Sequence, residues 1–591
     1  MLTILGLTKY YGNQVLFKDV DLNIGYKEKI GLVGRNGSGK STFLKILLGD
    51  ESPQEGKIEI PKGYTIRSLE QHLKFQEKTI LAQVCSALPK NSFNEDWKAK
   101  SILMGLGFSE ADFDRSPLEF SSGFQVRIRL AEALVLESDL LLLDEPTNYL
   151  DILSLRWLER FLKSWKGAFI LVTHDQHFMD LVVTHTVAIH RGQMRKMRGG
   201  PIKLLEHIKK DEEIYEKTRQ NQEKKREKED EFIRKFRAGA RSAGLVQSRI
   251  KSLAKQEVKE KLDNIPTIKF QFRSIPCKSD SVVQATDVSF GYSKDATLIK
   301  NFSLTTFPGD RIAIIGRNGK GKSTLLRLLH QTLEPDSGKV RMPPTLAVGY
   351  FGVDSIKALR PEKSIIEELN CVPGIPEQEV RNLCGALLFR GDDIKKRIST
   401  ISGGEKSRVC LGKTLLSPSQ LLMLDEPTNH LDMESVQALS EAIEKYQGTV
   451  IFVTHNEAML SRLATRLVLF DNNEIRVLEY GYDKFLSKDG WSEEDESAFK
   501  ASKGDSDNKK QYLDEKEHRK QQRLLKNQVE SLEKDIDKLE KEKVKLSESL
   551  KDVCLKKDVQ AIKEHGILLK DIQDKIDSKY VEMEQKMEEI E

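Results

Sequence analysis

The 591-residue sequence has few cysteines, and it has no long run of apolar residues. Its six cysteines are scattered along the chain: Cys85, Cys277, Cys371, Cys384, Cys410 and Cys554. None falls in a CxxC or similar spacing, which argues against a disulfide framework, a zinc finger and an iron–sulfur cluster. No window approaches the ~18–20 consecutive apolar residues of a bilayer-spanning helix, and the apolar start breaks at Lys9 before a signal-peptide core develops. We therefore expect a cytoplasmic protein with no membrane partner.

Charge of one sign is also scarce, because the formal net charge is only +4. Any attraction to nucleic acid must then come from a local patch and not from the average. Hydrophobic residues make up 38% of the chain and charged residues 31%, which is typical of folded, charge-rich proteins and excludes a wholly disordered one. The length predicts two to four domains.

The chain contains an internal repeat. GRNGSGKST at Gly34 to Thr42 recurs as GRNGKGKST at Gly316 to Thr324, 282 positions later. LLLLDEPTNYLD, which ends at Asp151, recurs 281 positions later as LLMLDEPTNHLD, which ends at Asp432. An apolar run that ends in Thr-His recurs with the same shift. Three motifs in the same order, shifted by 281 or 282 positions, are much stronger evidence for a repeat than a single match.

Both GxxxxGK[ST] segments stand between an apolar, strand-like run and a helix-like run. This context predicts a phosphate loop, in which backbone N–H groups surround an anion, the lysine reaches the β- and γ-phosphates, and the serine faces Mg²⁺. A simple glycine turn before a helix is the weaker interpretation. The predicted nucleotide-binding residues are Gly34, Arg35, Asn36, Gly37, Ser38, Gly39, Lys40, Ser41 and Thr42, and Gly316, Arg317, Asn318, Gly319, Lys320, Gly321, Lys322, Ser323 and Thr324.

Acidic pairs and histidines end the other repeated strands. Asp144 and Asp425 each follow four apolar residues, which predicts a carboxylate at the carboxyl edge of a parallel sheet, near Mg²⁺ together with Ser41 and Ser323. The next residues, Glu145 and Glu426, are predicted to orient or deprotonate the attacking water. His174 and His455 close a further strand and are predicted to reach the γ-phosphate, although a lone histidine there is more often packed.

Small residues at two predicted helix starts suit a phosphate group. They are Ser121, Ser122 and Gly123 in the first repeat, and Ser402, Gly403 and Gly404 in the second.

The order of phosphate loop, SGG-type signature, DEPTN strand end and Thr-His, found twice, resembles the ATP-binding cassette superfamily over roughly 400 residues. The resemblance implies that each signature closes over the opposite cassette's nucleotide. Site one then combines Lys40 with Ser402, and site two combines Lys322 with Ser121. It also implies that adenine stacks on Tyr11 and Tyr292, although a core or surface tyrosine is the simpler alternative.

Two departures from the family pattern fall on site two. The resemblance implies a metal-sensing glutamine after one strand, and Gln71 matches it in the first cassette, whereas Val353 stands at that position in the second. Ser122 replaces a signature glycine and adds a side chain where backbone should approach a phosphate. We expect slower hydrolysis at site two, with Asp354 as a possible substitute for the glutamine.

A basic run follows the first cassette. Residues 232–255 hold seven Lys or Arg and no acid, which fits several phosphate contacts without a code for bases, or else the solvated face of a helix. The predicted RNA-contacting residues are Arg234, Lys235, Arg237, Arg241, Arg249 and Lys251. In the tail, two heptad seams over 525–550 and 559–590 favour an antiparallel hairpin, and an intermolecular coiled coil stays open.

We expect an α/β fold with two tandem P-loop NTPase domains, a helical linker hairpin and a C-terminal coiled-coil hairpin. The predicted limits are 1–204 for cassette 1, 205–280 for the basic linker, 281–489 for cassette 2, 490–510 for a flexible connector and 511–591 for the tail.

Two cassettes without a membrane domain, joined by a charged helical linker, resemble the ABC-F subfamily. The resemblance implies a monomeric ATPase that uses Mg²⁺ and ATP. It would bind the ribosome at the exit-tRNA site, contact ribosomal RNA and peptidyl-tRNA, and regulate or rescue translation, with antibiotic resistance by ribosome protection as one form. The energy subunit of an ABC transporter is the alternative, and the basic linker speaks against it. A DNA-repair cassette ATPase and a scaffold with dead sites fit less well, because insertions are missing and both Lys, Asp and Glu are retained.

Overall fold

The structure is a computed structural model of the chain. It describes residues 1–12, 14–69, 75–88, 96–236, 268–277, 279–293, 296–389, 391–429, 431–471, 474–491 and 578–579. The chain divides into two compact units, Met1–Ser502 and Lys503–Glu591. The predicted tail hairpin lies outside the described residues except for Ser578 and Lys579. No helix among the described residues is long and apolar enough to cross a membrane.

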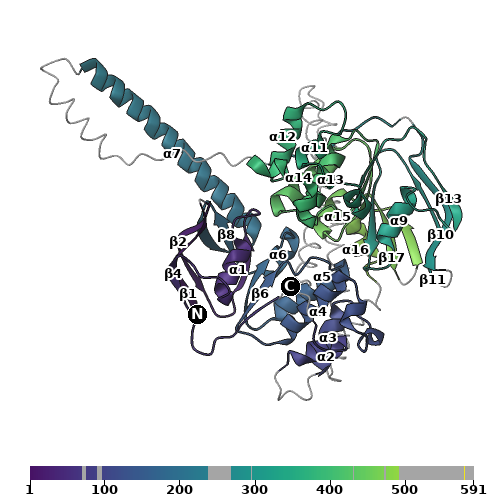
Figure 1. The fold of residues 1–591 in the computed structure, drawn as a ribbon, viewed down its shortest axis with the longest axis horizontal. Coiled ribbons are helices and arrows are strands. Elements are labelled where there is room, and N and C mark those ends of the chain that lie inside the picture. Colours follow the sequence, from purple (N-terminus) through teal and green to yellow (C-terminus); the bar gives the residue numbers. More distant parts are fainter. Residues whose placement is uncertain are drawn as a thin grey trace, which may run out of the picture. The chain divides into compact units, whose positions relative to one another are not determined.

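The first cassette contains two sheets (Figure 1). An antiparallel sheet has the order β2-β1-β4, from Gln14–Ile24, Leu2–Tyr11 and Glu55–Glu59. A six-stranded sheet has the order β5-β6-β7-β3-β8-β9, from Ile66–Ser68, Leu140–Asp144, Ala168–Val172, Lys29–Val33, His185–His190 and Gln193–Arg198. Only its β8–β9 pair is antiparallel. Its α-helices are α1 Lys40–Leu48, α2 Ile80–Ser86, α3 Asp96–Gly105, α4 Ser122–Val135, α5 Ile152–Ser164 and α6 Gln176–Val182.

The second cassette repeats this topology. Its small sheet has the order β11-β10-β13, from Ala296–Thr306, Val283–Ser293 and Ser337–Arg341. Its large sheet has the order β14-β15-β16-β12-β17-β18, from Val348–Phe351, Leu421–Asp425, Thr449–Val453, Arg311–Gly316, Arg466–Asp471 and Glu474–Leu478. Its α-helices are α9 Lys322–Leu329, α10 Val353–Lys357, α11 Ile365–Leu369, α12 Glu377–Ala386, α13 Gly403–Leu416, α14 Met433–Lys445, α15 Glu457–Leu463 and α16 Tyr482–Lys488.

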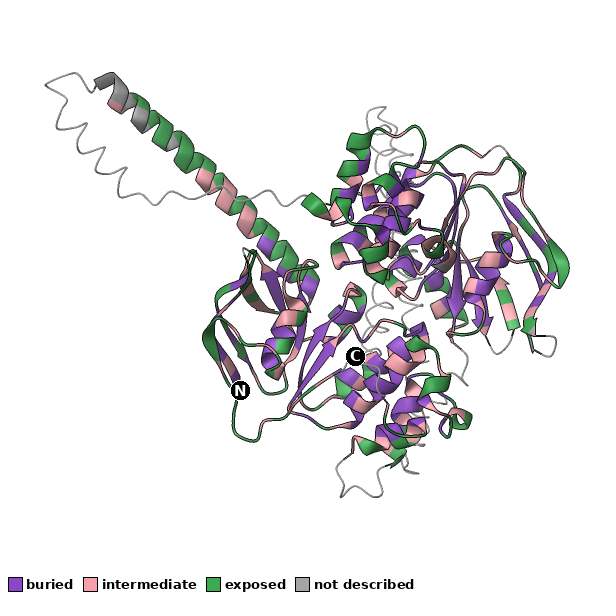
Figure 2. Ribbon diagram, in the orientation of Figure 1, coloured by how far each residue is buried: buried purple, intermediate pink, exposed green. Residues whose placement is uncertain are grey.

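The apolar strand runs are buried on both faces, as Figure 2 shows for the central strands. Side chains alternate between the faces of a strand. In β15, Leu422 and Leu424 join one core cluster, whereas Leu421 and Met423 join the other. A continuous apolar strand is therefore the pattern that a parallel sheet between two layers requires.

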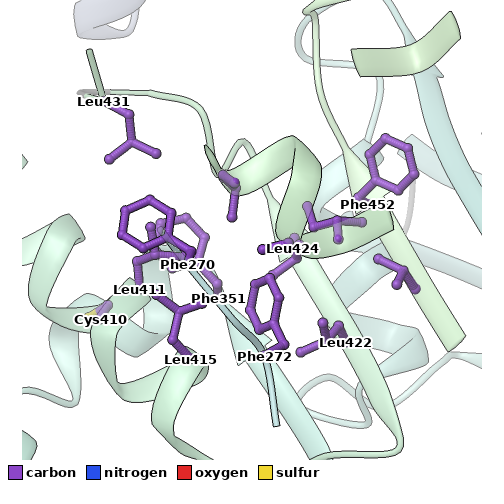
Figure 3. Packing of buried hydrophobic residues seen from close by; sticks show 14 of the residues in the cluster. Phe270, Phe272, Phe351, Cys410, Leu411, Leu415, Leu422, Leu424, Leu431 and Phe452 are labelled. Carbon is purple, nitrogen blue, oxygen red and sulfur yellow. The ribbon is translucent and has the colours of Figure 1, made fainter. Parts of the chain in front are cut away.

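The core of the second cassette includes a segment that the predicted limits place in the linker. Phe270 and Phe272 are buried in the same core cluster as Leu422 and Leu424 of β15, and Figure 3 shows Phe272 beside Leu424. The backbone N–H of Ile275 donates to the carbonyl of Ser419. These contacts tie residues 268–277 to the second cassette before the predicted start at residue 281.

The helix α7, Pro201–Phe236, leaves the first cassette as one continuous helix of 36 residues (Figure 1). At 1.5 Å per residue it is roughly 54 Å long. Leu204 and Ile208 pack in the core of the cassette, and beyond them the helix is mostly exposed. The matching helix in the second cassette, α16, has only seven residues. The predicted linker therefore begins as an extension of a helix that both cassettes share.

Candidate functional site

The two phosphate loops adopt the same local structure. Each connects a central strand to a helix, β3 to α1 and β12 to α9. Gly39 and Gly321 precede the helices with φ of 98° and 101°, a left-handed conformation that a side chain would strain. Lys40 Nζ donates to the Gly34 carbonyl at 2.7 Å, and Lys322 Nζ donates to the Gly316 carbonyl at 3.0 Å. Both ammonium groups therefore lie over their own loop, and burial lowers the pKa of both.

The predicted metal-facing residues meet in each cassette. Ser41 Oγ donates to Asp144 Oδ2 at 2.9 Å, and Ser323 Oγ donates to Asp425 Oδ1 at 3.0 Å. Burial raises the pKa of both aspartates. A hydroxyl and a carboxylate are oxygen donors of the kind that Mg²⁺ prefers, and this cation usually takes only one or two protein ligands beside phosphates and water. Both sites therefore fit a magnesium ion bound together with a nucleotide.

Glu145 and Glu426 lie directly after these aspartates in a left-handed backbone conformation, with φ of 52° and 47°. Residues other than glycine rarely adopt it, and such strain is concentrated at functional sites. Burial raises the pKa of both carboxyl groups to about 8. A carboxyl group whose pKa lies close to neutral pH can exchange a proton with water, as a general base requires.

Both predicted histidines lie beside these glutamates. His174 Nε2 lies 3.1 Å from Glu145 Oε1, and His455 Nε2 lies 3.2 Å from Glu426 Oε1. Burial, followed by the Lys322 ammonium, lowers the pKa of His455 well below its ordinary value, so its ring is neutral at pH 7. The sheet edge thus brings the predicted lysine, aspartate, glutamate and histidine together in each cassette.

The predicted signature residues start two matching helices of 14 residues each, α4 and α13. Ser402 is the N-cap of α13, and its hydroxyl donates to Glu405 Oε2 at 2.8 Å. Ser121 caps α4 without a side-chain hydrogen bond to the helix. Because Phe124 stands where α13 has Glu405, the first signature lacks this reciprocal cap.

The segment after the Asp-Glu strand of the first cassette contacts the phosphate loop of the second. Asn318 N–H donates to Asp151 Oδ2 at 3.1 Å, and Asn318 Nδ2 donates to the Tyr149 carbonyl at 3.0 Å. Asn318 Oδ1 also lies 3.0 Å from His455 Nε2. A cavity of about 240 Å³ is lined from both cassettes, by Tyr149 and His174 as well as Asn318 and His455. The two halves of the repeat therefore share this border.

Arg127 and Asp151, which recur in the second repeat as Arg408 and Asp432 but were assigned no site role from the sequence, support that border. Arg127 is 1% exposed and donates to the carbonyls of Leu106 and Tyr149 at 2.8 and 3.0 Å. Its guanidinium lies 3.5 Å from Asp151 and lowers the pKa of that carboxyl, although burial alone would raise it. Asp151 recurs as Asp432 at the end of the repeated motif, and this recurrence is the signal that could have identified it.

Further predicted residues are placed less completely. Tyr11 lies at the end of β1, is half-exposed and forms a hydrogen bond with Glu51 through its hydroxyl. Tyr292 lies near the end of β10, is more exposed and forms a hydrogen bond with the Thr324 hydroxyl. Arg234 and Lys235 fall in the last turn of α7. Gln71, Arg237, Arg241, Arg249 and Lys251 lie outside the described residues.

Comparison with known proteins agrees with this geometry. A family model described as ABC transporter matches residues 17–148 and 299–429, and an extension model with the same description matches 187–272. The ATP-binding protein YdiF of Bacillus subtilis (strain 168) is 32% identical over 535 residues, which cover 83% of both chains. The ATP-binding cassette sub-family F member 3 of Mus musculus is 31% identical over 80% of this chain and 72% of its own length.

Among solved structures, the archaeal ribosome recycling factor crystallised with an archaeal ribosomal stalk protein has a TM-score of 0.54. It is 22% identical, over 80% of this chain and 89% of that chain, so it supports the fold alone. The protein is an ATPase, as the relatives and the paired ATPase domains indicate. The chain belongs to the ABC-F family of tandem-cassette ATP-binding proteins.

Proposed function

We propose that the chain is an ATP-driven factor that acts on ribosomes in the cytoplasm. The observation that carries this proposal is α7, because a 36-residue helix grows from a position where the second cassette has only the seven residues of α16. The residues that follow are basic from 234 to 255. We propose that the helix carries this basic run, which would bind the phosphates of RNA.

The base of α7 is fixed to the first cassette by charge pairs. Glu212 Oε1 lies 2.8 Å from His190 Nε2 and 2.6 Å from Arg191 Nε, while Asp211 pairs with Arg195 at 2.7 Å. Leu205 and Ile208 line a small cavity together with Lys40. The start of the helix thus lies beside the first phosphate loop, and we propose that closure of the site moves the helix through this contact.

The proposed cycle has two composite sites. Lys40 and Lys322 bind the triphosphates. The pairs Ser41–Asp144 and Ser323–Asp425 face the magnesium ion. Each site is closed by the signature of the opposite cassette, which carries Ser402 or Ser121. The magnesium ion supplies charge neutralisation of the phosphates. Glu145 and Glu426 then take a proton from the attacking water, and hydrolysis reopens the cassettes.

On the ribosome, the closed pair would present the basic linker to ribosomal RNA and peptidyl-tRNA in the exit-tRNA site. Release after hydrolysis would regulate or rescue translation, with ribosome protection against antibiotics as one specialised outcome. The projecting helix and its basic continuation favour this role over that of a transporter energy subunit.

Co-sedimentation with ribosomes tests the proposal. The Glu145→Gln/Glu426→Gln double variant should pellet with ribosomes in ATP and be largely released in ADP, because slowed hydrolysis retains the closed state. Replacing Arg234, Lys235, Arg237, Arg241, Arg249 and Lys251 by alanine should abolish pelleting at moderate salt. Six exposed lysines of the first cassette, changed to alanine in the same way, serve as the control of equal charge: Lys18, Lys57, Lys62, Lys78, Lys100 and Lys166. Equal pelleting by both sets, or none in ATP at any salt, would reject the ribosome role.

A further inference from the structure

The second cassette lacks the predicted glutamine at a defined point of the fold. Ile66 of β5 pairs with Leu140, and Val348 of β14 pairs with Leu421, so the two edge strands correspond residue by residue. The same spacing places Val353 opposite Gln71. A valine side chain offers no polar atom to a metal, yet the chain turns directly into the helix α10 there.

An ion pair occupies this point in the second cassette. Arg327 Nε of α9 lies 2.9 Å from Asp354 Oδ2 of α10. Both side chains are mostly shielded, with 23% and 34% exposed. Arg327 belongs to the helix that begins with Lys322 and Ser323, so the pair connects the turn after β14 to the phosphate-loop helix.

Tyr350, His330 and Gly352 pack beside the Arg327–Asp354 ion pair. The Tyr350 ring stacks on His330 of the α9 C-terminus, with centroids 4.4 Å apart. A Cβ added at Gly352 would come within 2.7 Å of the Tyr350 hydroxyl, so only glycine leaves room for this ring.

The corresponding positions of the first cassette cannot build this cluster. In place of Arg327, His330, Tyr350, Gly352 and Asp354 the repeat has Lys45, Leu48, Ser68, Glu70 and His72. The Arg327–Asp354 pair therefore stands in the second cassette at positions where the first has Lys45 and His72, beside the position of Gln71.

The cluster lies at the metal edge of the sheet. β14 runs beside β15, with Phe351 opposite Leu424, and Asp425 is the next residue of β15. Asp354 follows Phe351 by three residues, beyond the same edge. Ser323, which donates to Asp425 at 3.0 Å, comes from the helix that carries Arg327.

We propose that Asp354 is the oxygen donor that site two uses toward Mg²⁺, through the water shell of the ion, in place of the missing glutamine, with Arg327 as its positioning residue. A carboxylate only accepts hydrogen bonds, whereas an amide also donates them. Asp354 therefore helps to hold the metal but cannot donate to the γ-phosphate. Site two becomes a site that retains Mg·nucleotide. This inference rests on the proposed nucleotide site of the second cassette.

The test measures metal dependence and not turnover. In the full chain carrying Lys40→Ala, binding of a fluorescent N-methylanthraniloyl ATP reports the second cassette, and it is titrated at increasing free Mg²⁺. Asp354→Asn should raise the Mg²⁺ concentration for half-maximal binding roughly 10-fold, as loss of an outer-shell partner does. Nucleotide affinity in EDTA should not fall. Adding Val353→Gln to Asp354→Asn should restore most of the metal dependence.

Matched controls separate the possible failures. Glu334→Gln removes an exposed carboxylate of the same cassette and should leave the Mg²⁺ dependence unchanged. Arg327→Lys keeps the charge but loses the planar fork, and should give a smaller shift in the same direction; it decides the matter if Asp354→Asn does not fold. A shift no larger than that of Glu334→Gln overturns the role of Asp354. Nucleotide binding that survives Lys40→Ala/Lys322→Ala would instead overturn the site itself.

Discussion

The two cassettes keep the same reacting groups but support them with different side chains. In the helical region of the first cassette, buried Gln83 donates to Glu132 Oε1 at 2.7 Å. At the matching position of the second, fully buried Glu368 pairs with Lys413 at 2.6 Å and with Arg360 at 2.8 Å. Both partners have changed, and the hydrogen-bonded contact between the two helices has been kept.

This difference shows which residues of the repeat are fixed by the reaction and which only need a hydrogen-bond partner. Lysine, serine, aspartate, glutamate and histidine recur at both sheet edges. Each site must bind the phosphates, the metal ion and the attacking water with the same kinds of groups. A buried polar contact only needs its donors and acceptors satisfied, so its members can exchange together. Where the second cassette lacks a residue that the first has beside the nucleotide, as at Val353, the two sites should hydrolyse ATP at different rates.

The largest expected effect concerns the two bases. Glu145→Gln should lower the steady-state ATPase rate by about 10²–10⁴-fold, as loss of a general base does, because site one has the complete set of groups. Glu426→Gln should leave the rate almost unchanged, since Val353 and Ser122 slow site two so that it supplies only a small share of the total. Phosphate release assays on both variants measure this, with nucleotide binding as the control for folding. Equal losses would show that the two sites contribute alike.

The next largest effect breaks the exchanged polar pairs. Lys413→Glu gives Glu368 a like charge as its neighbour and should lower the free energy of unfolding by about 3–5 kcal/mol. Glu368→Gln/Lys413→Glu recreates the pair of the first cassette and should recover most of that loss. Urea unfolding of the single and double variants measures the coupling. If the double variant is no more stable than Lys413→Glu, the two pairs are not equivalent.

The residues predicted to contact phosphate, metal and water could largely be identified from the sequence. The buried residues that hold them in place could not. The repeat located Lys40, Asp144 and Glu145, because their motifs are short and local. Glu368 gave no such signal, since a buried charge is recognised only through partners that lie far away in the chain. Arg127 recurs as Arg408, but the sequence does not show that it binds Tyr149 and Asp151. The predicted tail hairpin, the domain limits and the RNA contacts stay predictions.

A smaller effect on the free energy of unfolding is expected at acid pH, where the Glu368 ion pairs of the second cassette are lost. Although burial alone would raise it, the hydrogen bonds from Arg360 and Lys413 lower the pKa of Glu368 below its ordinary value. The stabilisation is therefore present above about pH 4.3, the unfolded pKa, and is lost as the pH falls through the folded pKa. Glu368→Gln should thus destabilise the protein at pH 7 by about 1–3 kcal/mol and by less at acid pH. Unfolding free energies of wild type and variant, measured from pH 7 to pH 3.5, should converge; a constant gap would contradict the ion pairs.

The smallest expected effect concerns the two tyrosines that the family resemblance assigns to adenine. Tyr11 is less exposed than Tyr292, at 50% against 65%, its hydroxyl bonds to Glu51, and Lys9 Nζ lies 5.2 Å from its ring centroid. Stacking of a base on an aromatic ring is worth about 1–3 kcal/mol, so Tyr11→Ala should weaken ATP binding at site one roughly 5–10-fold or more.

Tyr11→Phe is the matched control for this prediction, because it removes the hydroxyl bond to Glu51 and keeps the ring. It should bind ATP within about two-fold of wild type, since the bond to an exposed partner contributes little. Tyr292→Ala should weaken binding at site two by less than Tyr11→Ala weakens site one, because its ring is more exposed before ATP binds and must be ordered on binding. Titrations in the Lys322→Ala and Lys40→Ala backgrounds separate the sites. If Tyr11→Phe binds as weakly as Tyr11→Ala, the hydroxyl and not the ring carries the contact.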